Sequence, residues 1–544
     1  MLRMRQLSKT VLERYEFAAA ILLTLLLIAG HVIFFFGAGP LWRDEISSLA
    51  LATRPTLAEL WKSLPLDPFP ASYFLLLRSW NAIGLGNGDL PVRGLGLVIG
   101  LSLIAALWWS CYLIDKSVPL WPLALFGFSP LALEGGDSLR PYGFGLIWIV
   151  LAFASFWRIA WSGSRIGSRT SAVIFAVLSV QSLFTNAFMI LALSGGAILV
   201  LSMGKPRSRL ALVIVVGLIA AVTLLPYVPV LRVTGDWSKI IANKNDVASV
   251  GAVALDAIAD AGLPAYWIWL SLSCALLIAF LISLWPKLAT ALGLDRERAI
   301  FAGTTLLVAG SATIGFLIVA RYLVYPRYFL PAMAVTALCL HLFWRALPNR
   351  ILIRSISLIL GLFVAATSLP GLYARANLRM TNCDQIASGV EQRAGSEDLV
   401  IVTSFLYGVS FQRYYHGKTG WVAMPQLADL SLHRWDLLKE AIARPDPVPQ
   451  LVSRAEPVLR GGHKVFLVGK LGPPPAEQPE PFPPAPKTKF GWQMEAYLAQ
   501  WQSEVAYWIE HHALHGTELT PAEKQSVNPL ERLGLFEVSG WRER

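Results

Sequence analysis

The stretch FAAAILLTLLLIAGHVIFFFGAGPLWRDE (residues 17–45) decides the fold, because a long apolar run ends directly on a cluster of charges. A helix needs about 20 apolar residues to cross the hydrocarbon core of a membrane, and residues 17–37 supply them. A basic segment precedes the run, and the run is longer than the apolar core of a cleaved signal peptide, which is about 7–15 residues. We therefore expect an uncleaved first span rather than a signal peptide.

The composition of the whole chain agrees with a membrane protein. Of its 544 residues, 55% are hydrophobic and only 15% are charged, and the mean hydropathy is +0.54. Soluble domains are typically about 25% charged, and disordered chains have low hydrophobicity, so both classes are excluded. The net charge of +11 lies mostly in short clusters between apolar runs, which indicates membrane topology rather than nucleic-acid binding.

Ten further segments are predicted to span the membrane: 91–114, 118–135, 141–157, 170–184, 187–203, 210–231, 265–286, 299–319, 328–345 and 352–371. The segment 68–86 is also apolar, but it carries Arg78 and Asn81. If this segment lies flat as an amphipathic interfacial helix, the basic loops between the spans all fall on the same side of the membrane as the basic N-terminus. The positive-inside rule requires this arrangement. The sequence therefore predicts about eleven spans, an inside N-terminus and an outside C-terminus.

The chain divides into a membrane domain, 1–371, and an extracytoplasmic C-terminal domain, 372–544, predicted as a small α/β unit. Its predicted strands are 399–405 and 463–469, its predicted helices are 383–394 and 428–443, and residues 472–486 form a proline-rich strap. Aromatic residues between Trp492 and Trp508 recur at helical spacing. His511, His512 and His515 follow these aromatic residues, and the spacing predicts that His511 and His515 share one face of the helix. The three histidines are either the solvated end of the helix or a metal site.

Four charged clusters border predicted spans and face the outside: Arg43, Asp44 and Glu45; Asp67; Asp137, Arg140 and Tyr142; Arg321, Arg327 and Tyr328. Each has a structural alternative, because acidic residues cap helices or start turns and arginines at span ends reach lipid headgroups. Carboxylates beside several arginines also suit a substrate that has a phosphate and a hydroxyl to deprotonate. The spans hold almost no ionisable residues away from their ends, which argues against a transporter.

Two of these clusters belong to longer motifs. W-x-D-E at Trp42, Asp44 and Glu45 precedes D-x-x-P-x-x-Y-x-x-L-x-x-x-W at Asp67, Pro70, Tyr73, Leu76 and Trp80. This order resembles the GT-C membrane glycosyltransferases, in particular the bacterial protein-mannosyltransferase-like, family 39-type enzymes. R-P-Y at 140–142 and P-R-Y-x-x-P at 326–331 extend the resemblance, which covers residues 17–371.

The resemblance implies an inverting enzyme of cell-envelope glycolipid or polysaccharide biosynthesis, on the outer face of the bacterial inner membrane. It would move a sugar from a polyprenyl-phosphate-sugar donor to a hydroxyl of a lipid, glycan or protein acceptor. Asp44 would be the catalytic base and Arg327 would face the donor phosphate. The residues expected to bind substrate are Arg43, Glu45, Asp67, Asp137, Arg140, Tyr142, Arg321, Arg327 and Tyr328.

The chemistry needs few groups. A lipid phosphate leaves as a stabilised anion, so arginines can replace a general acid, and one carboxylate with direct displacement predicts inversion. No metal ligand is assigned; a divalent cation on Asp44 or Glu45 is the alternative to phosphate binding by arginines. The alternative functions are a flippase or transporter for lipid-linked glycans and a polysaccharide ligase or polymerase.

Overall fold

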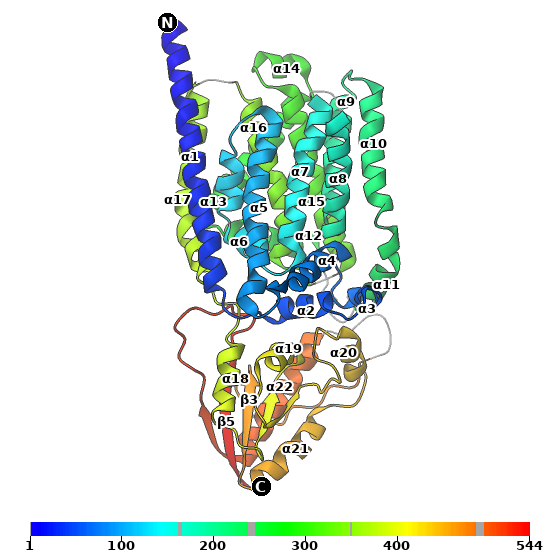
Figure 1. Ribbon diagram of the computed structural model, residues 1–544, viewed down its shortest axis with the longest axis vertical. Helices are drawn as coiled ribbons and strands as arrows, with labels where there is room; N and C mark the ends of the chain where they lie inside the picture. Colours follow the sequence, from blue (N-terminus) through cyan, green and yellow to red (C-terminus); the bar gives the residue numbers. More distant parts are fainter. Residues whose placement is uncertain are drawn as a thin grey trace.

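The computed structural model describes residues 2–161, 166–237, 245–321, 323–348, 351–485 and 494–543. A tall bundle of helices carries a smaller sheet-containing domain at one end, and the N-terminus lies at the opposite end (Figure 1). The last residue of the predicted proline-rich strap lies outside the described residues. The helix α17 continues past residue 371 into the connection between the two parts.

Among the described residues, eight helical segments are long and apolar enough to cross a membrane. They are α1 (Leu2–Gly37), α5 (Asp89–Asp115), α7 (Pro141–Trp161), α10 (Arg207–Val222) with η4 (Leu225–Tyr227) and α11 (Val228–Trp237), α13 (Leu263–Ser283), α15 (Arg296–Ala320), η5 (Pro326–Phe329) with α16 (Leu330–Ala346), and α17 (Ile351–Ala376). Shorter apolar helices complete the bundle: η3 (Pro122–Gly127) with α6 (Pro130–Asp137), α8 (Ile166–Ser182) and α9 (Asn186–Leu201). The count of eleven spans stays a prediction, although each predicted span falls on one of these elements.

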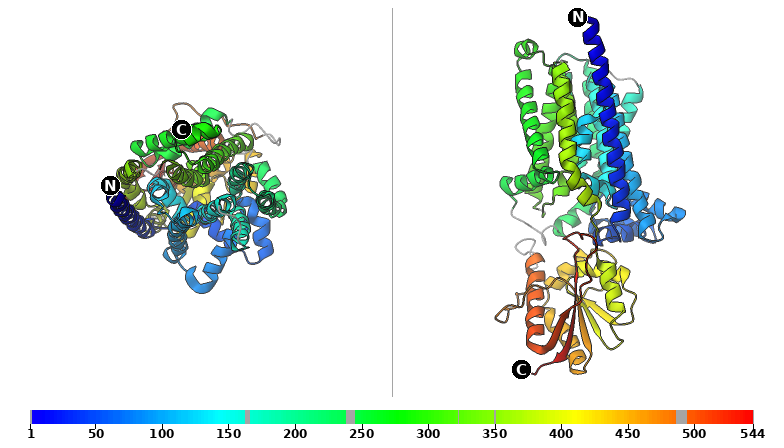
Figure 2. Two further views of the ribbon diagram at one scale, coloured as in Figure 1. Left: turned by 90° about the horizontal axis from the view of Figure 1, so that it is seen from above. Right: turned by 90° about the vertical axis from the view of Figure 1, so that its left-hand side faces the viewer.

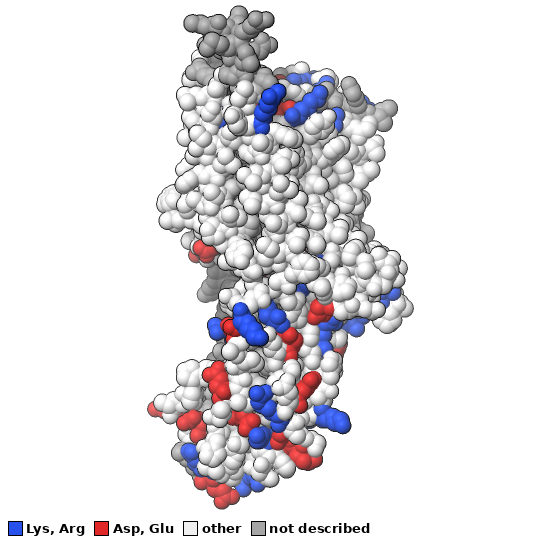
Figure 3. Space-filling view, turned by 60° about the vertical axis from the view of Figure 1, so that its left-hand side comes forward, with Lys and Arg blue, Asp and Glu red and all other residues white. Residues whose placement is uncertain are grey.

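One face of the bundle has a broad band that is almost free of charge (Figure 3). Figure 3 shows white side chains between a basic rim at one end and the mixed charges of the smaller domain at the other. Helices satisfy their own backbone hydrogen bonds, which is the condition for lying in lipid. The views in Figure 2 show the long helices running side by side through this band. The chain is therefore a multi-pass membrane protein, as its composition predicts.

Short helices lie across one end of the bundle, between α1 and α5 (Figure 1): α2 (Arg43–Ala52), α3 (Leu57–Ser63), η1 (Leu64–Leu66), α4 (Ala71–Trp80) and η2 (Asn81–Leu85). The ten residues of α4 rise about 15 Å, too little to cross a core about 30 Å thick. Arg78 donates hydrogen bonds to the carbonyls of Ala52, Arg54 and Pro55. The charge within segment 68–86 therefore caps the end of α2, and the helix lies among the short helices at the end of the bundle (Figure 1), where an interfacial helix is predicted.

The C-terminal domain is built on a five-stranded sheet of order β2-β1-β3-β5-β4. Its strands are β1 (Leu399–Val402), β2 (Gly420–Ala423), β3 (Lys464–Gly469), β4 (Ala513–Glu518) and β5 (Gly534–Trp541). β1 pairs in parallel with β2 and β3, whereas β5 runs antiparallel to β3 and β4. The helices of this domain are α18 (Cys383–Glu391), α19 (Phe405–Tyr414), α20 (Trp435–Ile442), α21 (Val448–Arg460) and α22 (Met494–His512). The two remaining helices, α12 (Val247–Ala259) and α14 (Pro286–Ala291), belong to the bundle.

The predicted strands 399–405 and 463–469 correspond to β1 and β3, whose buried apolar runs are the clearest strand signal in this part of the sequence. β4 carries one buried residue among six, so its sequence has no strand-like alternation to detect. The expectation of a shared helical face for His511 and His515 is wrong, because α22 ends at His512 and His515 lies on β4. His511 stacks on Tyr507 with ring centroids 3.9 Å apart.

Polar contacts dock the C-terminal domain onto the bundle. Arg413 of α19 binds Asp89 at the start of α5 with an N–O distance of 2.6 Å, and the Tyr414 hydroxyl donates to the carbonyl of Leu41 at 2.8 Å. Glu531 accepts a hydrogen bond from the backbone N–H of Arg43 at 2.9 Å. Burial, opposed by the Arg43 charge and a hydrogen bond from Ser410, raises the pKa of Glu531 to about 7. These contacts place the domain directly over the short helices.

Candidate active site

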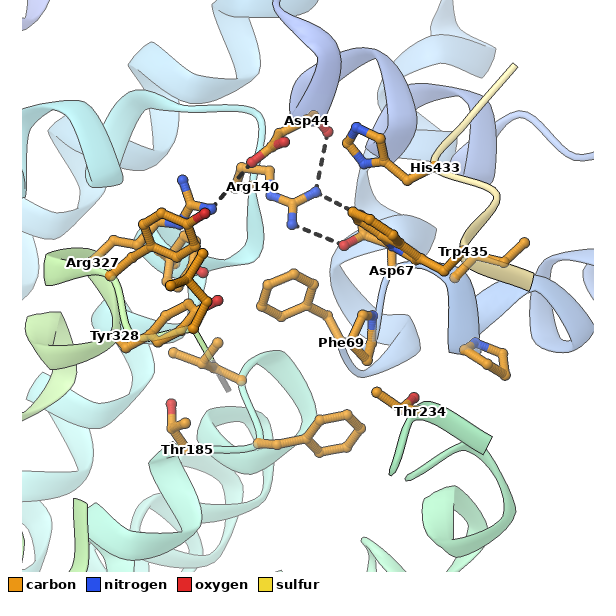
Figure 4. A pocket seen from close by; sticks show the side chains of 18 of the residues that line it. Asp44, Asp67, Phe69, Arg140, Thr185, Thr234, Arg327, Tyr328, His433 and Trp435 are labelled. Atoms are coloured by element: carbon orange, nitrogen blue, oxygen red, sulfur yellow. Dashed lines mark hydrogen bonds and ion pairs between the residues drawn. The ribbon is translucent and has the colours of Figure 1, made fainter. Parts of the chain in front are cut away.

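A cavity of about 310 Å³ lies where the short helices, one end of the bundle and the C-terminal domain meet (Figure 4). Its polar lining comes from separate parts of the chain: Arg43, Asp44, Asp67, Arg140, Tyr142, Tyr325, Arg327, Tyr328 and His433. Its apolar lining comes mainly from the bundle and includes Leu183, Phe184, Leu231, Phe316, Leu317 and Leu323. The cavity is therefore amphipathic, with charged groups and apolar groups lining the same space.

The first turn of α2 explains why Asp44 is available to this cavity. The helix begins at Arg43, and the carboxylate of Glu45 accepts the backbone N–H of Trp42 at 3.3 Å. Glu45 thus caps the helix from the N3 position. Consecutive helical residues point about 100° apart, so Asp44 faces a different direction. The cap alternative for the acidic pair is therefore confirmed for Glu45, whereas Asp44 is not the capping residue.

Asp44 lies between two guanidinium groups. One of its oxygens is 3.4 Å from a terminal nitrogen of Arg327, and the other is 4.0 Å from Nε of Arg43. Burial alone would raise the pKa of Asp44, but Arg327 and Arg140, with smaller contributions from His433 and Arg43, lower it to about 2. Asp44 is therefore ionised at neutral pH.

Arg140 and Asp67 form a closed pair beside Asp44, whose carbonyl oxygen accepts a hydrogen bond from Arg140 at 3.1 Å. The two terminal nitrogens of Arg140 lie 2.6 Å and 2.8 Å from the two oxygens of Asp67, a bidentate arrangement. Ser48 donates to the same carboxylate at 3.0 Å. The Arg140 guanidinium also lies over the Phe69 ring, 4.9 Å from its centroid. Asp67 is thus a structural partner of Arg140 rather than a turn starter alone.

The charges inside the cavity do not cancel. Arg43, Arg140 and Arg327 supply three positive charges, whereas Asp44 and Asp67 supply two negative charges. A third carboxylate of the lining, Glu495, is exposed at the rim. Since Asp67 neutralises Arg140, one carboxylate is left for two guanidinium groups. The interior therefore has a surplus positive charge that suits an anionic group of a ligand.

Three residues predicted to bind substrate lie away from the cavity lining. Glu45 is fully buried and pairs with Arg93, whose terminal nitrogens lie 3.0 Å and 2.8 Å from the Glu45 oxygens. An oxygen of Asp137 lies 2.7 Å from Nδ1 of His31, within hydrogen-bond and ion-pair distance. Arg321 is an exposed residue that ends α15 in a left-handed conformation. These three residues therefore lie outside the cavity, and their contact with substrate stays a prediction.

Close helix packing buries Asp137. A Cβ atom at Gly100 of α5 would lie 1.9 Å from an oxygen of Asp137, and one at Gly96 would lie 1.9 Å from the Asp137 carbonyl oxygen. Glycine at these two positions lets α5 approach the end of α6. The Asp137 carboxylate then faces His31 of α1 inside the bundle. Asp137 therefore does not line the cavity, although it borders a predicted span in the sequence.

The C-terminal domain supplies lining residues that the sequence did not indicate. His433 and Trp435, at the start of α20, line the cavity beside Asp44 and Asp67 (Figure 4). The backbone N–H of His433 contacts Ser47 Oγ at 3.4 Å across 386 residues of sequence. No local spacing announces a contact of that range. Among the described residues, no group of three His, Cys, Asp or Glu side chains has the arrangement of a metal site.

No protein-family model and no curated protein matches this sequence. Two solved structures of ArnT from Cupriavidus metallidurans are similar to the chain, each at 14% sequence identity. The structure in the apo state has a TM-score of 0.49 and the match covers 83% of this chain and 93% of that chain. The structure bound to undecaprenyl phosphate has a TM-score of 0.47, with 82% and 92% covered. No residue role is carried over at this similarity.

The buried pair of Glu45 and Arg93 predicts a stability effect. Glu45→Gln keeps the side-chain shape but leaves the Arg93 guanidinium, 2% exposed, without its charged partner. Loss of one partner of a buried ion pair costs about 3–5 kcal/mol, so the variant should have a lower Tm. Glu495→Gln, exposed at the rim, is the control and should melt like the wild type. A wild-type Tm for Glu45→Gln would show that the pair contributes little.

Proposed function

We propose that this protein is an inverting glycosyltransferase that moves a sugar from a polyprenyl-phosphate-sugar donor to an acceptor hydroxyl. The observation that carries the proposal is the Asp44 carboxylate between Arg327 and Arg43 in an amphipathic cavity. A carboxylate can accept the proton of a hydroxyl, and guanidinium groups stabilise the charge of a departing phosphate. The apolar lining suits a lipid that carries this phosphate.

The donor would bind with its phosphate near Arg327 and its prenyl chain toward the apolar wall. Arg327 has one nitrogen 3.4 Å from Asp44, while its Nε is buried without a hydrogen-bond partner among the described residues. Its guanidinium lies 4.6 Å from the centroid of the Tyr325 ring, which holds the plane of the group. A fixed, incompletely satisfied guanidinium is suited to paired hydrogen bonds with phosphate oxygens.

The proposed step is a single displacement. The acceptor oxygen attacks the anomeric carbon and forms the new C–O bond, while the bond from that carbon to the phosphate oxygen breaks. The electron pair of the broken bond leaves with the polyprenyl phosphate, whose charge Arg327 and Arg43 stabilise. Asp44 takes the proton of the acceptor hydroxyl. One displacement inverts the anomeric configuration, and no second carboxylate is needed as a nucleophile.

The electrostatics of Asp44 favour base action only after the donor binds. Its pKa of about 2 depends on Arg327, Arg140 and Arg43 opposing the effect of burial. A bound phosphate would place negative charge beside Arg327 and Arg43, and negative charge near a carboxylate raises its pKa. Asp44 therefore becomes a stronger base when the phosphate is present, which couples deprotonation of the acceptor to occupancy by the donor.

We further propose that the site faces the outside of the bacterial inner membrane. The basic rim in Figure 3 lies at the end of the bundle opposite the C-terminal domain, and basic loops are retained on the cytoplasmic side. The site and the docked domain then lie in the extracytoplasmic space, where the acceptor would be an envelope lipid, glycan or protein. No metal ligand is assigned, and a divalent cation at Asp44 stays an alternative.

The orientation is testable with single cysteines in a Cys274→Ser background, since the other three cysteines are buried. Ser208 lies exposed beside the basic end of α10, whereas Lys418 is exposed on the C-terminal domain. In intact spheroplasts, a membrane-impermeant maleimide should label Lys418→Cys and leave Ser208→Cys unlabelled until the membrane is permeabilised. The reverse pattern would place the site in the cytoplasm and contradict the proposed donor.

Asp44→Asn tests the base. The substitution keeps the side-chain size and removes the charge, so deprotonation of the acceptor should fail while the donor pocket remains. We expect product to fall by about 10²–10⁴-fold, measured by mass spectrometry of envelope glycans in a deletion strain that carries the variant. Binding of undecaprenyl phosphate to the purified variant in nanodiscs should persist. Product within a few-fold of wild type would assign Asp44 a positioning role instead.

Arg327→Lys tests the phosphate contact. Lysine keeps the charge but cannot form a planar, paired contact, so affinity for undecaprenyl phosphate should fall about tenfold, the effect of losing about 1.4 kcal/mol. Arg321→Lys is the matched control, because Arg321 follows α15 at the same end of the bundle but lies outside the cavity lining. Equal binding by both variants would mean that Arg327 contacts lipid headgroups and that the phosphate is held elsewhere.

A further inference from the structure

His433 belongs to the C-terminal domain, yet it lines the cavity beside Asp44 (Figure 4). Two contacts fix its position. Its backbone N–H faces Ser47 of α2 at 3.4 Å, and its ring lies 5.4 Å from the Trp435 ring at an interplanar angle of 36°. Trp435 in turn meets the fully buried Phe405 edge to face at 5.7 Å. The core of the C-terminal domain and the helix that carries Asp44 therefore position this imidazole together.

The imidazole has an unused polar atom. Nε2 of His433 is buried without a hydrogen-bond partner among the described residues, and the residue is 7% exposed. A buried nitrogen without a partner costs free energy in the folded protein, so such groups are rare and call for an explanation. Because His433 lines the cavity, a ligand in the cavity can supply the missing hydrogen bond.

The charge state of His433 restricts the ligand. Asp44 would favour the protonated ring, whereas Arg43, Arg140 and Arg327 oppose it. Burial has the largest effect, and together these groups lower the pKa of His433 to about 4. The ring is then neutral at physiological pH and adds no positive charge for a phosphate. A neutral imidazole nitrogen matches an uncharged hydroxyl.

Trp435 adds the second element of the same wall. Its indole is half-buried and lines the cavity next to His433. An indole offers a large, rigid apolar face, and a sugar ring offers C–H groups on its face and hydroxyls on its edge. One aromatic plane beside one neutral hydrogen-bonding nitrogen therefore fits a saccharide better than a phosphate or an alkyl chain. The arginines would then bind the phosphate of the donor, and the apolar wall of the bundle would contact its lipid chain.

We propose that the C-terminal domain supplies the acceptor subsite, in which His433 Nε2 hydrogen-bonds a hydroxyl of a neutral sugar whose ring packs against Trp435. This inference rests on the proposed glycosyltransferase function and narrows its acceptor to a glycan. It also gives the docking of the two domains a role in the reaction, because the acceptor would contact both: Asp44 on the bundle side and His433 on the other.

Two substitutions separate hydrogen bonding from packing. His433→Phe keeps an aromatic ring against Trp435 but has no polar atom, whereas His433→Gln has an amide that reaches the region of Nε2. Glycan product in the complemented deletion strain should fall about tenfold or more for His433→Phe and stay within about threefold of wild type for His433→Gln. Undecaprenyl phosphate should bind both purified variants as it binds the wild type. His463→Phe, exposed on the same domain, should behave as wild type.

The outcomes distinguish this inference from the function on which it rests. Normal product from His433→Phe overturns the acceptor contact and leaves the donor assignment intact. A wild-type protein that fails to bind undecaprenyl phosphate overturns the proposed function and this inference with it. If His433→Phe lowers the Tm, His433→Asn replaces it, because asparagine reaches only the region of Nδ1. Equal product from the asparagine and glutamine variants then refutes a contact through Nε2.

Discussion

The bidentate pair between Arg140 and Asp67 is the interaction on which the cavity depends, because it joins three separate parts of the chain. Asp67 lies between η1 and α4, Arg140 directly precedes α7, and Ser48 of α2 donates to the same carboxylate. Both charged groups are buried, so removing either would leave an uncompensated charge at a cost of about 3–5 kcal/mol. With the Arg140 guanidinium paired to Asp67, the Asp44 carboxylate forms ion pairs with Arg327 and Arg43, while the nearby Arg140 charge still lowers the pKa of Asp44.

The boundary between lipid and water explains where the charges lie. Unpaired charges are costly in the apolar band, so the polar groups of the cavity collect at one end of the bundle while apolar side chains form its other wall. An open site at this edge would be filled by water. The C-terminal domain covers it, held by Arg413 on Asp89 and by Glu531 on the backbone of Arg43, and this cover strengthens every electrostatic contact inside.

Neighbouring residues of like charge have different roles here because of helix geometry. Asp44 and Glu45 are adjacent acids, but only Asp44 lines the cavity, while Glu45 caps α2 and binds Arg93. Arg321 and Arg327 show the same contrast at the junction of α15 and α16, where only Arg327 reaches the cavity. A charge beside a predicted span is therefore a candidate for function, and the direction of its side chain decides whether it takes part.

The sequence by itself determined the membrane class, the positions of the apolar helices, the helix within segment 68–86 and the order of most charged cavity residues, because hydrophobic runs and charge placement are local properties of the chain. It also indicated two strands of the C-terminal domain, whose apolar runs are local too. Only the tertiary structure decided that Glu45 and Asp137 turn away, through the partners Arg93 and His31. It alone brought His433 to the cavity, across 386 residues from Ser47, because such contacts depend on how whole elements dock and leave no periodic trace in the sequence.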